Sequence, residues 1–238
     1  SILIAVNQFG KNGIASSQVI ISTIIFIIFL PLVIWSERKS VRPIIDASLL
    51  RNRNYSFGIL SLLLHYLAHG SVLLAAPFLL LTAMGYEPVK AGVMMAAFSA
   101  PRICLAPFAG RASDRFGPRY LFVLGNIMLV IGLILVSQAE AGYGEIFIWL
   151  GMLSCGIGAS LFEPVVTSAI MGSVPKTRLG TASASVGVGR QVAFAIGLTV
   201  AGAVYAFQKM KYSLNTDWVE NIIEISALSD TLFLGALI

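Results

Sequence analysis

Charged residues are scarce in this chain of 238 residues. Only 11% of the residues are Asp, Glu, Lys or Arg, whereas 57% are apolar. Soluble domains carry charge on about a quarter of their residues, so the composition excludes an ordinary soluble protein. The mean hydropathy of +0.87 agrees with this. The chain is therefore predicted to be an integral membrane protein.

Cysteine and histidine are also rare. Cys104 and Cys155 each lie inside an apolar run, so a disulfide framework is excluded and both are expected to pack as small side chains. The two histidines, His65 and His69, are spaced to share one helix face. A metal ion would need further ligands, and no cysteine or carboxylate cluster supplies them, so no metal site and no cofactor is predicted. His65 is a candidate to line a cavity, whereas His69 is expected to pack with a hydrogen-bond partner.

Several classes of function have no motif here. The net charge of +5 raises nucleic acid as a partner, but the basic residues sit in short loops and form no patch interleaved with exposed aromatic residues. The sequence has no nucleophile elbow, no phosphate-binding loop and no paired carboxylates for acid and base catalysis. We therefore predict that the chain is not an enzyme and does not bind nucleic acid.

Long apolar runs are what the sequence does contain. Residues 18–35 form a charge-free run of 18 residues, close to the ~20 residues that cross a hydrocarbon layer of ~30 Å. Further membrane-spanning helices are predicted at about 55–82, 89–109, 119–137, 145–173, 181–207 and from 229 onward. The predicted fold class is an all-α membrane protein.

These spans divide the chain into three regions. Residues 1–35 are interpreted as connecting transmembrane helices, the first of them partial, and residues 36–54 as a basic cytoplasmic linker. Residues 55–238 are predicted to form a six-helix bundle whose last helix is incomplete. Because both ends of the chain fall inside apolar segments, we expect a fragment that is truncated at both ends.

The distribution of Lys and Arg predicts the orientation in the membrane. Ten of these residues fall in segments 36–54, 110–120 and 174–180, and four fall in the connections on the other side. Positive residues mark the cytoplasmic side, so the three segments are predicted to be cytoplasmic loops of a multi-pass protein in an inner or plasma membrane. The connection from Gln208 to Asp230 is predicted to be a long outer loop.

A tight cytoplasmic turn of eleven residues is predicted from Gly110 to Tyr120, a charged segment between two apolar runs. Gly110 and Gly117 would allow close backbone approach and dihedral angles that other residues resist. Asp114 would meet the positive end of the next helix dipole, and the arginines would pair with it or face lipid headgroups.

The spacing G-x-x-x-D-R-x-G-x-R of this turn resembles the loop signature of the major facilitator superfamily of secondary transporters. In that family the turn joins adjacent helices and helps to set the conformational balance. The matching residues are Gly110, Asp114, Arg115, Gly117 and Arg119. Pro118 departs from the family pattern, which usually has a basic residue there, and this weakens the charge network.

Nearly the whole chain resembles one branch of this superfamily, the fourteen-span drug and proton antiporters. The similarity includes the basic linker, the Gly110 turn and the run from Pro175 to Ala184 that leads to Arg190. It implies a carboxyl-terminal half whose partners are the lipid bilayer, the absent amino-terminal half, protons and a small hydrophobic substrate. The implied function is proton-coupled efflux of hydrophobic drug-like compounds, cationic or neutral, by alternating access.

Among the ionisable residues that fall inside predicted spans well away from both ends are His65, Arg102, Glu163 and Arg190. A charge at the centre of a bilayer costs ~2.5–3.5 kcal/mol on insertion scales, so these side chains should face protein or water. Their positions along the helices place them roughly 12–18 Å deep, in one polar layer. They are the candidates for proton coupling and substrate binding.

Glu163 is the only acidic residue well away from both ends of a predicted span and is the best candidate for a proton site in this half. We hypothesise that it neutralises Arg102 or Arg190 in one state and is protonated or substrate-bound in another, because an approaching arginine favours the ionised carboxylate. The alternative is a static ion pair that holds helices together.

Two alternatives to drug efflux stay open. One is a major facilitator transporter of another small solute, such as an amino acid, a sugar or a siderophore. The other is a non-transporting membrane scaffold or receptor, which burial of every polar residue in fixed pairs would favour. Aromatic residues and methionines would suit a drug-accepting cavity. The candidates are Phe57, Tyr66, Phe78, Phe98, Phe108, Phe162, Phe194, Met94, Met95 and Met152.

Overall fold

The computed structural model describes residues 47–138, 144–213 and 220–237. Within these ranges every regular element is a helix and no strand occurs. The predicted all-α fold is therefore confirmed for the described part of the chain. The predicted span at 18–35 and residues 36–46 of the linker lie outside the described residues.

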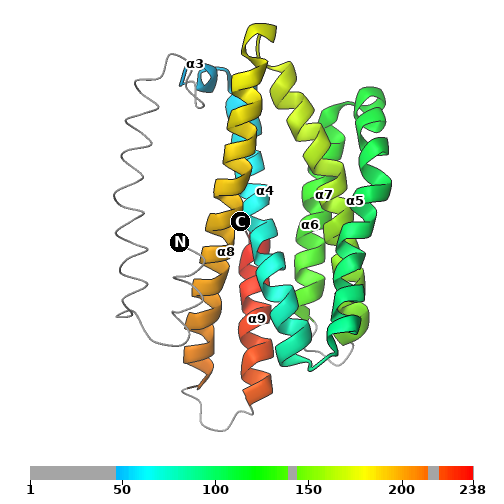
Figure 1. The fold of residues 1–238 in the computed structure, drawn as a ribbon, viewed down its shortest axis with the longest axis vertical. Helices are drawn as coiled ribbons and strands as arrows, with labels where there is room; N and C mark the ends of the chain where they lie inside the picture. Colours follow the sequence, from blue (N-terminus) through cyan, green and yellow to red (C-terminus); the bar gives the residue numbers. More distant parts are fainter. Residues whose placement is uncertain (1–46, 139–143, 214–219, 238) are drawn as a thin grey trace.

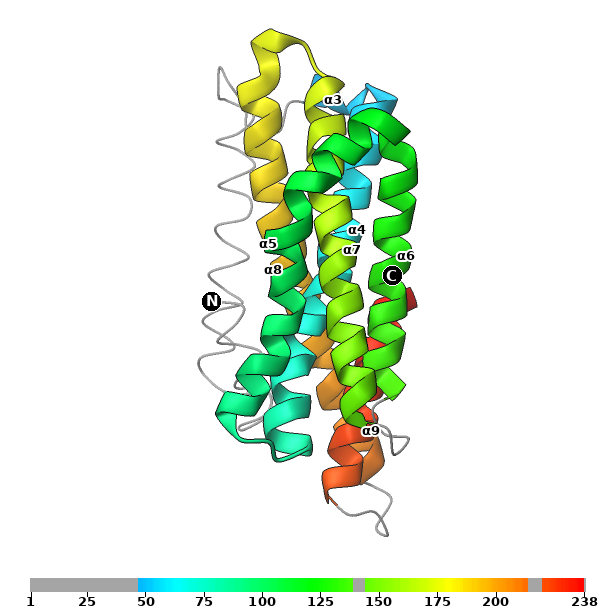
Figure 2. The same cartoon turned by 90° about the vertical axis from the view of Figure 1, so that its right-hand side faces the viewer.

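Long helices run side by side and form an elongated bundle (Figures 1 and 2). They are α4 (Arg53–Phe78), which continues as the π-helix η1 (Leu79–Ala83), α5 (Pro88–Phe116), α6 (Pro118–Ser137), α7 (Gly144–Gly172), α8 (Leu179–Ser213) and α9 (Glu220–Leu237). The short α3 (Ala47–Leu50) precedes α4, and the 3-10 turn η3 (Lys176–Arg178) precedes α8. In the described chain, five helices are long and apolar enough to cross a membrane, and α9 has a shorter apolar stretch at Ile225–Ala236.

The turn predicted at Gly110 to Tyr120 is largely helical, which corrects the prediction. Helix α5 continues through Phe116, and the single residue Gly117 joins it to α6. No residue between Gly110 and Phe116 breaks a helix, whereas Pro118 disfavours the helical conformation at the residue before it. Gly117 has φ 85° and ψ 148°, a conformation that glycine adopts readily. Its predicted conformational role is therefore confirmed.

The other glycine of the motif has a different role from the predicted one. A Cβ atom placed on Gly110 would meet no atom of the described chain within 4 Å, so the expected close backbone approach at this glycine is wrong. Arg115 and Arg119 are exposed on either side of Gly117. The side chain of Asp114 lies outside the described residues.

The long outer loop predicted from Gln208 to Asp230 is wrong as well. Helix α8 continues to Ser213, and α9 begins at Glu220. Gln208 Nε2 and the Tyr212 hydroxyl donate hydrogen bonds of 3.0 Å and 2.7 Å to Asp230 Oδ2. These polar side chains therefore join two helices and do not belong to an outer loop.

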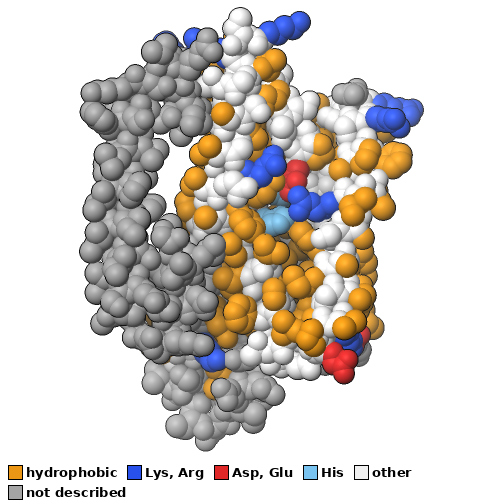
Figure 3. All heavy atoms as spheres, viewed as in Figure 1, with side chains coloured by type: hydrophobic (Ala, Val, Ile, Leu, Met, Phe, Trp, Pro, Cys, Tyr) orange, Lys and Arg blue, Asp and Glu red, His pale blue; other side chains and the backbone are white. Residues whose placement is uncertain are grey.

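The helices pack in pairs, α6 on α7, α4 on α8 and α5 on α7, and contacts between α4 and α7 link the pairs. Within the described chain, α5 and α8 make no contact with each other. The bundle is therefore open between these two helices, with α4 and α7 behind them (Figures 1 and 3). We call this side of the bundle the open face.

Candidate functional site

An ion pair joins α5 to α7 on the open face. Arg102 Nη2 donates hydrogen bonds to both carboxylate oxygens of Glu163, at 2.8 Å and 2.7 Å. The side chain of Arg102 is 36% exposed and that of Glu163 is 17% exposed. The pair therefore stands at the edge of an accessible space, inside two helices that are long enough to span a membrane.

His65 on α4 is buried beside this pair. Its ring stacks on Phe162, the residue before Glu163, with ring centroids 4.0 Å apart. His65 Nδ1 lies 3.0 Å from Asn126 Oδ1 on α6. Asn126 Nδ2 in turn donates to the carbonyl of Phe122, at 3.2 Å, which turns the amide oxygen toward the histidine. His65 Nδ1 therefore carries the hydrogen, and its Nε2 presents a lone pair.

His69 lies one helical turn after His65 and reaches the open face. Its ring meets Phe98 edge-on, with centroids 5.0 Å apart. His69 Nδ1 is buried without a hydrogen-bond partner in the described chain, as is His65 Nε2. His69 is also one of the residues that line the pocket described below. The structure thus exchanges the roles expected for the two histidines, because His69 faces the cavity and His65 holds the hydrogen bond.

Arg190 on α8 approaches the same cluster from the other side of the open face. Its guanidinium carbon lies 5.4 Å from the centroid of the Tyr66 ring, a cation–π distance. Arg190 Nε is buried and has no hydrogen-bond partner among the described residues. The four intramembrane ionisable residues therefore belong to one region, and Glu163 pairs with Arg102 in this conformation. Figure 3 shows charged and histidine side chains gathered in the hollow between α8 and α5.

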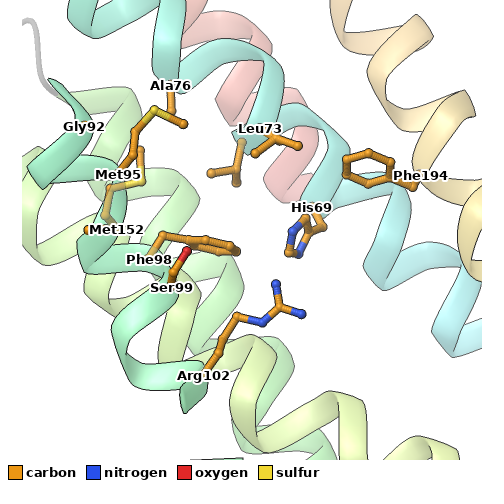
Figure 4. Close-up of a pocket in the computed structure, with 12 residues that line it drawn as sticks. His69, Leu73, Ala76, Gly92, Met95, Phe98, Ser99, Arg102, Met152 and Phe194 are labelled. Atoms are coloured by element: carbon orange, nitrogen blue, oxygen red, sulfur yellow. The ribbon is translucent and has the colours of Figure 1, made fainter. Parts of the chain in front are cut away.

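A pocket of about 580 Å³ opens beside the ion pair. In the close-up, the guanidinium of Arg102 points toward His69 at one end of the pocket, and Phe98, Met95 and Leu73 lie to one side of them (Figure 4). The complete lining is His69, Val72, Leu73, Ala76, Gly92, Met95, Ala96, Phe98, Ser99, Arg102, Met152 and Phe194. The wall is therefore mostly apolar, with a cationic and an imidazole group at one end.

Part of the predicted drug-cavity set lies elsewhere. Phe57, Phe78 and Phe108 are exposed on the surface of the described chain, and Phe162 and Met94 are buried. Sequence reasoning also missed Asn126, which orients His65. Its signal was present, because Asn126 is a lone amide within the apolar run of residues 121–136.

Residues 58–213 match the family model of the Major Facilitator Superfamily. The chain belongs to this superfamily. This confirms the predicted family and the prediction of a transporter in place of an enzyme. The spans of the described residues agree with a multi-pass protein of the inner or plasma membrane.

The chain is similar to several named bacterial proteins. It is 30% identical over 207 residues to "Multidrug resistance protein Stp" of Mycobacterium tuberculosis, which covers 87% of this chain and 38% of that protein. It is 24% identical over 211 residues to "Lincomycin resistance protein LmrB" of Listeria innocua, covering 89% of this chain and 45% of that protein. "Riboflavin transporter RibZ" of Clostridioides difficile is 25% identical over 212 residues, with 89% and 45% covered. The chain thus spans less than half the length of these three relatives.

Proposed function

We propose that the complete transporter exports hydrophobic drug-like compounds in exchange for protons, with Glu163 as a proton site. The Arg102–Glu163 contact at the wall of the pocket is the observation that carries this proposal. Glu163 is paired with an arginine in this conformation. When Arg102 withdraws, the carboxylate loses the cation that balances it, and a proton from the pocket takes its place.

The pocket suits a hydrophobic substrate. Met95 and Met152 provide flexible, polarisable surface that adapts to different shapes, and Phe98 and Phe194 provide aromatic walls. Two relatives bear the names of resistance proteins, "Multidrug resistance protein Stp" and "Lincomycin resistance protein LmrB". Both observations support export of drug-like compounds. Because Arg102 lines the pocket, a substrate that enters it also contacts the partner of the proton site.

The open face is where the amino-terminal half of the transporter would pack. In secondary transporters of this kind, two halves rock around a binding site near the middle of the membrane. Here α5 and α8 flank the site without touching each other, and the chain spans only 38% of the length of its relative Stp. On this proposal the second half closes the pocket, and the chain by itself transports nothing.

Export of a fluorescent cationic dye in membrane vesicles tests the proposal. The complete transporter is compared with Glu163→Gln, and a matched control is Glu145→Gln. Glu145 accepts from Lys90 at 2.8 Å and also joins α7 to α5, but both side chains are about half exposed. We expect the rate of proton-driven export to fall at least about tenfold in Glu163→Gln and to stay unchanged in Glu145→Gln. Undiminished coupling in Glu163→Gln would contradict the assigned proton site.

Transport of another small solute is the second candidate function. The relative named "Riboflavin transporter RibZ" is as similar to this chain as LmrB is, so the family resemblance alone does not select drugs. Absence of dye movement by the wild-type transporter, with proton movement on addition of another solute, would favour this alternative. A static scaffold is less well supported, because Arg102 and His69 face a pocket of about 580 Å³.

A further inference from the structure

Two imidazole rings and a carboxylate lie close together between α4 and α7. The ligand atoms of His65, His69 and Glu163 all lie within 4.8 Å of one another. Sequence reasoning excluded a metal ion because the two histidines had no third ligand, and the fold supplies that ligand from a residue about a hundred positions away. Both histidine rings are buried, with 2% and 5% of their surface exposed.

The two histidines have free nitrogen atoms at this point. His65 Nε2 and His69 Nδ1 are buried without a hydrogen-bond partner in the described chain. A buried polar atom without a partner is costly, and a native protein generally satisfies it with a ligand, an ion or water. Asn126 holds the hydrogen of His65 on Nδ1, which leaves Nε2 as the coordinating atom. An outer partner of this kind is typical of metal-binding histidines.

We propose that His65, His69 and Glu163 form a binding site for a first-row divalent metal ion of the Zn²⁺ class. Two imidazoles and one carboxylate suit zinc better than the oxygen-seeking Mg²⁺ or Ca²⁺. Zn–N bonds of about 2.0–2.1 Å place tetrahedral ligand atoms about 3.3 Å apart. The three side chains have to close by up to about 1.5 Å to reach this geometry, which rotations of the histidine and glutamate side chains supply.

The pocket gives the metal a route in and an open fourth position. His69 forms part of the pocket wall, so an ion that enters the pocket meets it first. Three protein ligands leave one tetrahedral position for water or for a donor atom of a transported compound. The site is therefore suited to an ion that exchanges with the pocket.

Arg102 competes with the metal for Glu163. Its Nη2 lies at 2.7 Å from one carboxylate oxygen, and a second positive charge beside a bound dication is unfavourable. Metal binding therefore requires Arg102 to leave Glu163. Removal of Arg102 should therefore strengthen metal binding. A damaged fold would weaken metal binding, so the two effects have opposite signs.

The site is tested by Co²⁺ binding and by competition with Zn²⁺, because the visible absorption of Co²⁺ reports its ligands. The protein is the purified complete transporter with an affinity tag that contains no histidine. We expect wild type to show a tetrahedral Co²⁺ spectrum that Zn²⁺ abolishes. His65→Ala, His69→Ala and Glu163→Gln should each weaken the affinity at least tenfold, and Glu145→Gln should not change it. Arg102→Gln should raise the affinity by at least threefold.

Two results would overturn the metal site. One is Co²⁺ affinity that is the same in wild type and His69→Ala. The other is an Arg102→Gln protein that is folded by size exclusion and binds Co²⁺ no more tightly than wild type. The metal site does not depend on which solute is exported. Dye export measured in the presence of a metal chelator distinguishes the metal site from the proposed proton-coupled function. We expect wild type to export the dye in the chelator, and the loss of export in Glu163→Gln can then be measured without any bound metal.

Discussion

The contact between α6 and α7 and the open face between α5 and α8 use glycine in opposite ways. At the contact, a Cβ atom on Gly158 would lie 2.6 Å from the carbonyl oxygen of Gly125, and one on Gly151 would lie 2.8 Å from that of Gly132. On α8, one of the two helices that flank the open face, a Cβ on Gly187 would meet nothing of the described chain within 4 Å. In lipid, helices associate through close packing, so the first set holds the bundle together. The second set leaves surface for another partner.

The difference shows that a glycine-rich stretch in a membrane helix does not by itself indicate a contact. Glycines in membrane helices often mark close contacts between helices. Gly151, Gly158 and Gly197 follow this rule, because an added Cβ would press on backbone atoms of a neighbouring helix. Gly187 does not follow it in the described chain.

The largest effect is expected for Gly158→Leu. The side chain would have to occupy the space of the Gly125 carbonyl and of Leu129, whose backbone nitrogen lies 2.8 Å from the added Cβ. We expect a loss of at least about 3 kcal/mol in stability or failure to fold. Thermal unfolding of the complete transporter in detergent measures it. A variant that melts like wild type would show that α6 and α7 are not closely packed.

Two ion pairs between α5 and α7 allow a matched comparison across the membrane. Arg102→Ala leaves Glu163 unpaired in the apolar interior, which costs about 3–5 kcal/mol in a fully buried site. The cost here should be about 1–3 kcal/mol, because Arg102 is 36% exposed. Lys90→Ala breaks the exposed pair with Glu145 and should cost less than about 1 kcal/mol. Equal melting temperatures for the two variants would contradict a larger contribution of the Arg102–Glu163 pair to stability.

Gly117→Ala isolates the conformation at the α5–α6 connection. Its φ of 85° and ψ of 148° are strained for any residue with a Cβ, so we expect a loss of about 1–3 kcal/mol. Gly110→Ala is the control, because Gly110 is helical and an added Cβ meets nothing within 4 Å. That control should be neutral or slightly stabilising, since alanine favours a helix over glycine. The same thermal unfolding assay compares them.

The smallest effect is expected for Gly187→Ala, within about 0.5 kcal/mol of wild type. The reason is the free space around Gly187 in the described chain. The measurement in the complete transporter also probes the proposed second half. A loss of more than about 1 kcal/mol would show that Gly187 is closely packed there against another segment.

The sequence predicted the positions of several spans well. The helices predicted near 55–82 and 119–137 lie within a few residues of the observed Arg53–Ala83 and Pro118–Ser137. A long apolar run bounded by charged residues forms a helix in a membrane because its backbone polar groups must bond within the segment. The pairing of Arg102 with Glu163 was one of two options, since a charged group in a membrane needs an opposite charge. Which of Arg102 and Arg190 pairs with Glu163 depends on how the helices pack, and the periodicity of the sequence does not predict that packing.

The sequence could not predict the details that depend on neighbours. His69 faces the pocket and His65 contacts Asn126 because of the orientation of α4 about its axis relative to α6 and α7. The spacing of two histidines on one helix face does not reveal that orientation. The sequence pattern does not predict the continuation of α5 through Phe116, because charged residues after an apolar run are typical of a loop. A helix that leaves the hydrocarbon layer has no physical reason to end until a residue such as Gly117 breaks it.

A one-residue connection turns α5 into a lever. Arg102 stands 15 residues before Gly117, which is about 22 Å along a helix. A tilt of about 10° at Gly117 would carry Arg102 by about 4 Å, further than the length of its contact with Glu163. If the segment through Pro107 moves as one body, a small rotation at the surface, where α5 meets α6, would be enough to open the charge pair in the middle of the membrane.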